Sequence, residues 1–320
     1  MKRFSRILFV AGSGADESAA LGQAVALANS NQAQMTMVGL VDAPELGRQS
    51  TLGESELLDA LVEQRRDQLQ TLAQSAATTE LTIEIKVLVG KAFLEIIREV
   101  LRHERDLVIK SLENIEGIGQ RLFGGTDMKL MRKCPCPVWL IKSVQQKGYR
   151  EILVALDYEP ENPENDALNL QVLEMASSLA LADFSELHIV HAWRLQYEGM
   201  LRSPRLSFSD ADVDTMVREE ESKRRRWLTD IVTKGCAAQG KEVTTYLKPQ
   251  LHMIEGDARY VVPQCATELA AELLVMGTVG RSGVPGFLMS NAAETILDQI
   301  DCSVLAIKPA GFVSPVTLAA

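Results

Sequence analysis

The chain has 320 residues, of which 46% are hydrophobic and 24% are charged, and its formal net charge is −10. This length and composition are typical of a soluble globular protein with two domains, each large enough to bury its own core. An acidic chain lacks the broad basic surface that releases counterions from a phosphate backbone, so nucleic acid is excluded as a partner class.

The first half of the chain alternates short runs of Val, Ile and Leu with longer helical patterns. The apolar run that follows the basic residues 1–6 has about five residues, too few for a signal peptide or a membrane span. We therefore expect a cytoplasmic protein with no membrane partner. The predicted strands of this half are 6–11, 35–41, 83–89, 106–110 and 137–142. Its predicted helices are 16–31, 54–76, 91–104 and 125–133.

The second half shows the same alternation, which indicates βαβ units and parallel sheets covered on both faces. Its predicted strands are 151–157, 186–192, 242–248, 272–276 and 303–308. Its predicted helices are 165–182, 209–239, 257–270 and 290–300. Residues 219–226 place three acids four positions before three bases, which predicts a solvated helix face with i,i+4 ion pairs.

Cysteine and histidine spacing favours neither disulfides nor a metal cluster. The five cysteines are an odd number, and Cys134 and Cys136 lack the Cys-x-x-Cys spacing, so we expect reduced thiols. The four histidines are scattered. His188 and His191 are three apart in a strand pattern and are expected on opposite faces, so no metal site is predicted.

The two halves are copies of each other, because residues 86–142 align with 252–308 at a constant offset of 166 without a gap. Gly90 falls on Gly256 in this register. The repeat predicts an N-terminal domain at 1–143, a C-terminal domain at 150–310 and a flexible tail at 311–320. Each copy is a control for the other, since a residue that the fold needs should occur in both, whereas a ligand residue can survive in one.

A glycine-rich stretch follows the fourth strand of the second half. Residues 275–291 contain four glycines, and a helix is predicted to begin near Ser290. Glycines at the carboxyl end of a parallel strand let backbone N–H groups approach an anion, and the next helix offers its positive end. The stretch is neither a Walker A loop nor the Gly-x-Gly-x-x-Gly of a first βα turn. A tight turn without a ligand is the alternative interpretation.

The spacing Gly277-x-x-Gly280, nine residues, then Ser290-Asn291 resembles the universal stress protein family. The strand at 152–157 and the last strand segment of the repeat, at 302–308, resemble that family too. Two copies, one of them degenerate, resemble the tandem E-type members of bacteria. The resemblance implies two Rossmann-like α/β domains, each a five-stranded parallel sheet with helices on both faces. It implies ATP or AMP, with Mg²⁺, as the nucleotide. The implied nucleotide-binding residues are Asp157, Gly256, Gly277, Thr278, Gly280, Arg281, Gly283, Ser290 and Asn291.

The sequence departs from the family pattern in ways that weaken phosphate binding. Ser290 replaces a glycine and adds bulk, and Asn291 replaces a Ser or Thr that meets phosphate. Four acids are also expected to border the crevice and to repel a triphosphate. These acids are Glu159, Glu161, Glu164 and Asp166. In the first half Gly12 stands in place of Asp157, and 110–114 lacks the glycines, so that domain is expected to act as a scaffold.

Three classes of function follow. The favoured one is a non-enzymatic regulatory or binding module of the stress response, with two domains paired inside one chain and weak or absent nucleotide binding in the C-terminal domain. The absence of a nucleophile with a neighbouring base in the sequence pattern favours it over catalysis. The alternatives are an ATP-binding switch or slow ATPase, and a carrier of another small ligand in the C-terminal crevice. A homodimer and unknown protein partners remain open.

Overall fold

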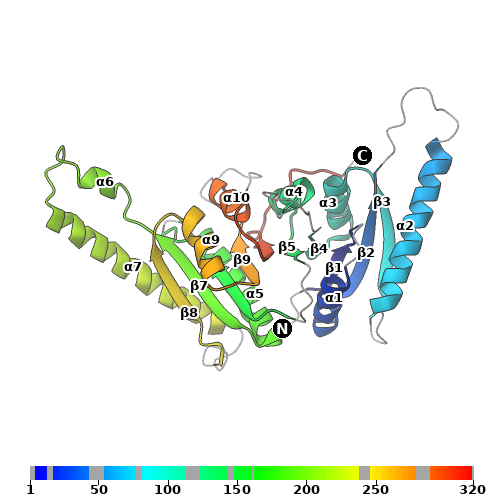
Figure 1. The fold of residues 1–320 in the computed structure, drawn as a ribbon, viewed down its shortest axis with the longest axis horizontal. Helices are drawn as coiled ribbons and strands as arrows, with labels where there is room; N and C mark the ends of the chain where they lie inside the picture. The colour runs from blue at the N-terminus through cyan, green and yellow to red at the C-terminus, as the bar shows by residue number, and fades with distance from the viewer. Residues whose placement is uncertain are drawn as a thin grey trace. The chain divides into compact units, whose positions relative to one another are not determined.

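The computed structural model describes residues 4–12, 17–42, 54–76, 81–112, 123–142, 148–160, 162–237, 246–278 and 289–318. It divides into two compact units (Figure 1). Unit 1 comprises Met1–Gly148, Ser282–Met289 and Asp301–Ala320, and unit 2 comprises Tyr149–Arg281 and Ser290–Ile300. The end of the second half of the sequence therefore belongs to the unit formed by the first half.

Unit 1 contains a sheet in the order β3-β2-β1-β4-β5-β10. The first five strands are parallel, as predicted, and β10 is antiparallel to β5, with Leu305 opposite Trp139. Ile7, Leu8 and Phe9 on β1 are fully buried, which agrees with a sheet covered on both faces. The strands are β1 (Arg6–Val10), β2 (Gln34–Val41), β3 (Ile83–Val89), β4 (Leu107–Ser111), β5 (Val138–Ile141) and β10 (Ser303–Ile307).

The helices of unit 1 are α1 (Ser18–Asn31), α2 (Glu54–Ala76), α3 (Ala92–His103) and α4 (Gly125–Lys133). The chain passes from β1 outward to β3 and then returns to β4 on the other side of β1. Because crossovers between parallel strands are right-handed, this reversal puts α1 and α2 on one face and α3 and α4 on the other. Accordingly, α1 packs beside α2 and α3 packs beside α4.

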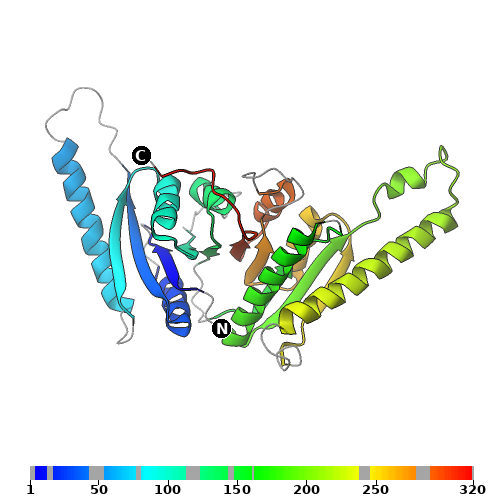
Figure 2. The ribbon, with the colours of Figure 1, turned by 180° about the vertical axis from the view of Figure 1, so that it is seen from behind.

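Unit 2 repeats this arrangement with four parallel strands in the order β9-β6-β7-β8. The helices α5 and α7 lie on the face seen in Figure 2, and α9 and α10 lie on the face seen in Figure 1. Its strands are β6 (Glu151–Ala155), β7 (Glu186–Trp193), β8 (Gln250–Glu255) and β9 (Leu273–Gly277). Its helices are α5 (Pro163–Asp183), α6 (Glu198–Leu201), α7 (Asp210–Ala237), α9 (Ala258–Glu268) and α10 (Asn291–Leu297).

The predicted strand at 242–248 is wrong in its described part. Residues 246 and 247 form a helical turn, and β8 begins at Gln250; residues 242–245 lie outside the described residues. The β-branched and aromatic run before Lys248 has a high strand propensity, but the packing of the edge strand against β7 decides its position. The offset of the repeat gives the observed place, because β3 at 83–89 maps onto 249–255.

The predicted tail packs partly against unit 1. Ser314 Oγ donates a hydrogen bond to the carbonyl of Lys133 at 2.7 Å, and Val316 is only 9% exposed. The domain boundaries drawn from the repeat remain predictions, since the two compact units divide the chain at other places. Within the described part of the chain, none of the helices has the length and apolar character needed to cross a membrane.

Candidate functional site

Unit 2 contains a cavity of about 510 Å³ at the carboxyl ends of β6, β7, β8 and β9. β6 pairs with β7 on one side and with β9 on the other, so the strand order reverses at this point. Ligands of open α/β sheets bind at such a switch point, because the loops diverge there and leave a crevice. The cavity is therefore the candidate site.

The structure brings five of the predicted nucleotide-binding residues to this cavity. Its wall includes Asp157, Gly256, Gly277, Ser290 and Asn291. Thr278 is fully buried beside them, and its carbonyl accepts a hydrogen bond from the Ser290 N–H at 3.0 Å. The other three, Gly280, Arg281 and Gly283, lie outside the described residues. A ligand-binding role for all nine stays a prediction.

Asp157 is exposed at the wall of the cavity while its backbone is fixed from α5. The side-chain amides of Asn165 and Asn169 donate to the carbonyl of Asp157 at 2.8 and 2.7 Å. The carboxylate Oδ1 accepts from the N–H of Tyr158 at 2.9 Å. These bonds orient one carboxylate oxygen, so Asp157 is suited to accept hydrogen bonds from a ligand.

Gly256 is required by the backbone. Its φ is +150°, and a Cβ there would lie 2.7 Å from Val261 Cγ2. Its N–H donates to the carbonyl of Trp193 at 2.7 Å. Gly90, its counterpart in unit 1, has a φ of +128° and donates to Val41 in the same way. Because both copies need this glycine, the fold accounts for Gly256 without a ligand.

We expect Gly256→Ala to lower the free energy of unfolding by about 1–3 kcal/mol, since the side chain is forced into a disfavoured φ and a close contact. Urea denaturation measures it. Gly199→Ala in α6 is the matched control, because a Cβ there meets nothing within 4 Å. This control should change stability by no more than about 1 kcal/mol, toward stabilisation. Equal effects of the two substitutions would contradict the assignment.

Gly277 lets α5 approach the end of β9. A Cβ at this position would lie 2.7 Å from Leu168 Cδ2, and the corresponding residue of unit 1 is Ser111. Ser290 is the N-cap of α10, and its Oγ accepts from the N–H of Ala293 at 3.1 Å. The hydroxyl oxygen of Ser290 is therefore engaged by the first turn of the helix.

Arginines on the cavity wall form a feature that sequence reasoning partly missed. Arg194 follows β7 directly, and Arg224 comes from α7. Arg224 lies 5.1 Å from the centre of the Tyr158 ring and pairs with Glu220 at 2.7 Å. Only 15% of the Arg224 side chain is exposed, so the predicted solvated face is wrong for this pair, although it describes the Arg225 side chain at 63%. Trp227, one turn further on, was the sequence signal for a buried face.

The third arginine is held by a neighbouring aspartate. Arg259 donates to both oxygens of Asp257, at 2.9 and 2.6 Å. The hydrogen bond from this side chain lowers the pKa of Asp257 to about 2. The same carboxylate caps α9 by accepting from the Arg259 N–H at 3.0 Å. The cavity wall thus carries three arginines and two aspartates, a nearly balanced set of charges.

The acids predicted to border the crevice do not line it in the described part of the loop. Glu159 accepts from the side chain of Asn162 at 2.8 Å, and Asp166 accepts from Trp227 Nε1 at 3.0 Å. Glu164 lies in the first turn of α5, and Glu161 lies outside the described residues. The prediction was wrong for Glu159, Glu164 and Asp166: hydrogen bonds to Asn162 and Trp227 hold Glu159 and Asp166, and Glu164 is exposed on α5.

In unit 1 side chains occupy the corresponding place. Arg65 of α2 donates to the carbonyls of Ala11 and Gly12, at 2.8 and 2.5 Å, where unit 2 has Asp157. Lys110 and Asp127, which match Met276 and Ala293 in the repeat, form a buried ion pair of 3.0 Å. The first copy therefore fills the end of its sheet with its own charged groups.

Comparisons with known proteins agree with this architecture. The model of the universal stress protein family matches residues 3–142 and 148–308. The chain belongs to the universal stress protein family. The predicted family, its tandem form and the α/β fold are thereby confirmed.

Among relatives of this universal stress protein, the universal stress protein E homolog of Haemophilus influenzae is 26% identical over 317 residues, covering 96% of this chain and 98% of the relative. Universal stress protein E of Salmonella typhi is 28% identical over 260 residues, covering 81% and 78%. A protein of unknown function from Pseudomonas aeruginosa PAO1 shares the fold with a TM-score of 0.67 at 24% identity, covering 96% of this chain and 94% of that one. A universal stress protein from Archaeoglobus fulgidus has a TM-score of 0.61 at 15% identity, covering 94% and 97%.

Proposed function

We propose that this chain is a non-enzymatic binding module of the stress response whose small-molecule site is the cavity of unit 2. Nucleotide binding there is weak or absent, and unit 1 serves as scaffold and partner surface in the cytoplasm. The strand β10 supports pairing of the two halves within one chain, because a segment of the second half completes the sheet of unit 1.

The difference between the two copies carries the proposal. Unit 2 leaves a cavity where its strands end, whereas Arg65 and the Lys110–Asp127 pair take the equivalent place in unit 1. A guanidinium bound to two carbonyls and a buried ion pair are costly to displace, since each partner would be left unsatisfied. A ligand is therefore expected to enter unit 2 alone.

The wall of the cavity favours a ligand with an apolar part and a small polar or anionic part. Leu156, Trp193, Val262, Met276 and Ile296 supply apolar surface. Arg259 and Arg224 are each already paired with a carboxylate. Little positive charge is left to compensate a triphosphate, which supports the carrier of another small ligand as the second candidate.

The test is native mass spectrometry of the purified chain, followed by calorimetric titration with ATP and AMP in the presence of Mg²⁺. We expect either no heat at millimolar nucleotide or one weak site per chain that Asp157→Ala abolishes. Gly12→Ala, at the corresponding position of unit 1, is the control and leaves that site unchanged. A co-purified ligand other than a nucleotide supports the carrier.

Three results would contradict the proposal. These are two equivalent nucleotide sites, binding that persists in Asp157→Ala, and hydrolysis of ATP that survives repurification. A single tight site with slow turnover would instead establish the ATP-binding switch. A homodimer detected by sedimentation would add a partner to the scheme without changing the site.

A further inference from the structure

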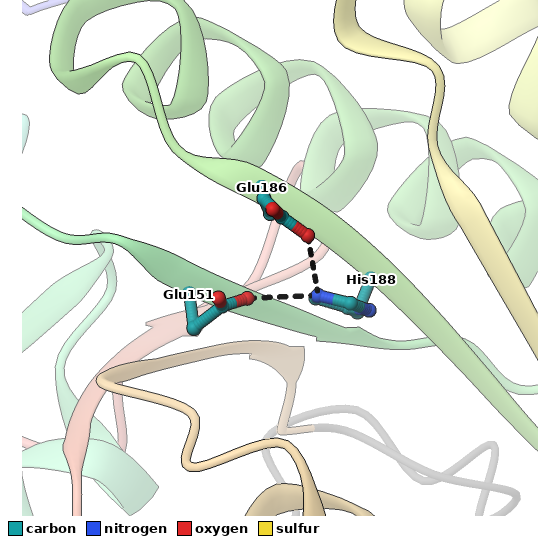
Figure 3. Close-up of side chains that lie close together, drawn as sticks. All are labelled: Glu151, Glu186 and His188. Carbon is teal, nitrogen blue, oxygen red and sulfur yellow. Dashed lines mark hydrogen bonds and ion pairs between the residues drawn. The ribbon is translucent and has the colours of Figure 1, made fainter.

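A second cluster of polar side chains lies in unit 2 at the amino ends of β6 and β7, whereas the cavity lies at their carboxyl ends. Glu151 is the first residue of β6, Glu186 is the first residue of β7, and His188 is the third residue of β7 (Figure 3). His188 Nε2 lies 2.8 Å from Glu151 Oε2 and 3.9 Å from Glu186 Oε2. One donor atom from each residue falls within 4.8 Å of the others, so the three side chains converge on one point.

The register of the sheet creates this convergence. Glu151 pairs directly with Glu186 across β6 and β7, and His188 follows two residues later on the same face of β7. Two carboxylates directly opposite each other on neighbouring strands repel, which destabilises the pairing of the strands. A cation at the point on which the three side chains converge would relieve this repulsion.

A second layer of side chains orients the first. His252 Nε2 lies 3.0 Å from Nδ1 of His188, and Gln250 Nε2 donates to Glu186 Oε2 at 3.0 Å. Both residues come from β8, the next strand. A histidine whose far nitrogen is hydrogen-bonded, and a carboxylate that is held by an amide, are the usual partners around a bound metal ion.

The three side chains of the cluster differ in exposure, so that one is fixed in the protein and another is accessible to solvent. The side chain of His188 is 5% exposed, that of Glu151 is 30% exposed and that of Glu186 is 65% exposed. An ion can approach from the Glu186 side, and that side leaves room for water. The imidazole, by contrast, is fixed in the protein.

Unit 1 shows that the fold does not require these residues. At the matching register Arg6 pairs with Gln34, and Thr36 takes the place of His188. Thr36 simply donates to Glu84 at 2.8 Å. The triad thus occurs in one copy only, which is the pattern expected of a site that serves a ligand.

We propose that Glu151, Glu186 and His188 bind one divalent transition-metal ion, best matched by Zn²⁺, with water completing the coordination. One imidazole nitrogen and two carboxylate oxygens are ligands that zinc accepts, in a tetrahedral set of four. Ca²⁺ and Mg²⁺ prefer shells of oxygen atoms and are selected against by the imidazole. In the bound state His188 coordinates through Nε2 and donates from Nδ1 to His252. The ion neutralises the facing carboxylates and joins β6 to β7.

The experiment is a titration of the chelator-treated full chain with Co²⁺, followed by absorption, and then with Zn²⁺ by calorimetry. We expect one Co²⁺ per chain with visible bands of a four-coordinate N/O site and no thiolate charge-transfer band, which separates this site from the five cysteines. Zn²⁺ should displace Co²⁺, whereas excess Mg²⁺ should not.

Glu186→Gln is the diagnostic variant, because the exposed side chain can change without unfolding the sheet. Its affinity for Co²⁺ and Zn²⁺ should fall at least about tenfold. Glu84→Gln removes a carboxylate at the sheet edge of unit 1 and should bind as the wild type does. Absence of saturable binding in the wild type, a thiolate spectrum, or equal affinity in Glu186→Gln would overturn the proposal. None of these results bears on the nucleotide test, because Asp157 lies at the carboxyl ends of the strands.

Discussion

Leu305→Ala should lower the free energy of unfolding of unit 1 by about 2–5 kcal/mol. Leu305 belongs to β10, is 2% exposed and lies opposite Trp139 of β5. Removing its side chain leaves a cavity beside Trp139, on a pair of strands that come from different halves of the sequence. The loss approaches the lower end of the total stability of a domain, about 5–15 kcal/mol, so part of unit 1 should unfold at moderate temperature.

Denaturation followed by tryptophan fluorescence measures this effect. Trp139 is the tryptophan of unit 1, and Trp193→Phe with Trp227→Phe removes the other two of the chain. Val313→Ala is the control, since it shortens a side chain that is 72% exposed on the same C-terminal segment. The control should shift stability by no more than about 0.5 kcal/mol. If the Trp139 transition is the same in Leu305→Ala and wild type, β10 is not part of unit 1 in solution.

The second large effect is a pH dependence of stability that Lys308→Met removes. Lys308 is 5% exposed, and its Nζ donates to the carbonyls of Met131 and Arg132 in the last turn of α4. Burial lowers its pKa from 10.5 to about 8. Between these two values the unfolded chain holds a proton that the folded chain has lost. Stability therefore rises as the pH increases through this window, by up to about 3 kcal/mol.

Urea denaturation at a series of pH values between about 8 and 10.5 gives the slope. The Cys136 thiol, whose pKa the hydrogen bond with Cys134 raises, titrates in the alkaline range too. The contribution of Lys308 is therefore the difference between the pH slopes of wild type and Lys308→Met. Lys142→Met changes the matching lysine of the first half, which is 30% exposed, and should keep the wild-type slope. The same slope in Lys308→Met and wild type would show that folding does not lower the pKa of Lys308.

Much of the fold could be predicted from the sequence, because the periodicity of its apolar residues is clear. The helices at 54–76 and 125–133 are observed with the predicted limits. The error at 242–248 arose from local strand propensity, which a long-range rule, the repeat offset, would have corrected. The antiparallel pairing of β10 with β5 was not predictable in the same way, because apolar content shows that a strand is buried but not which strand lies beside it.

The candidate site was predictable where glycines and strand ends mark it, and not where side chains from distant segments meet. Asp157 and Gly277 stand next to strands that are easy to recognise, and both line the cavity. Arg224 lies in a helix whose charge pattern resembles a solvated face, and only the contact with Tyr158 reveals its side. Glu151 and His188 are 37 residues apart and meet only through the register of β6 and β7.

The place of β10 also bears on how the protein is made. Unit 1 consists mostly of residues that leave the ribosome early, yet its sheet needs a strand at Ser303–Ile307 that emerges last among the described strands. Until then the edge of β5 has unpaired N–H and C=O groups, which can pair with another nascent chain. Vectorial synthesis therefore leaves this edge of the unit 1 sheet unpaired until β10 has been synthesised, and a chaperone that shields strand edges should matter most during that interval.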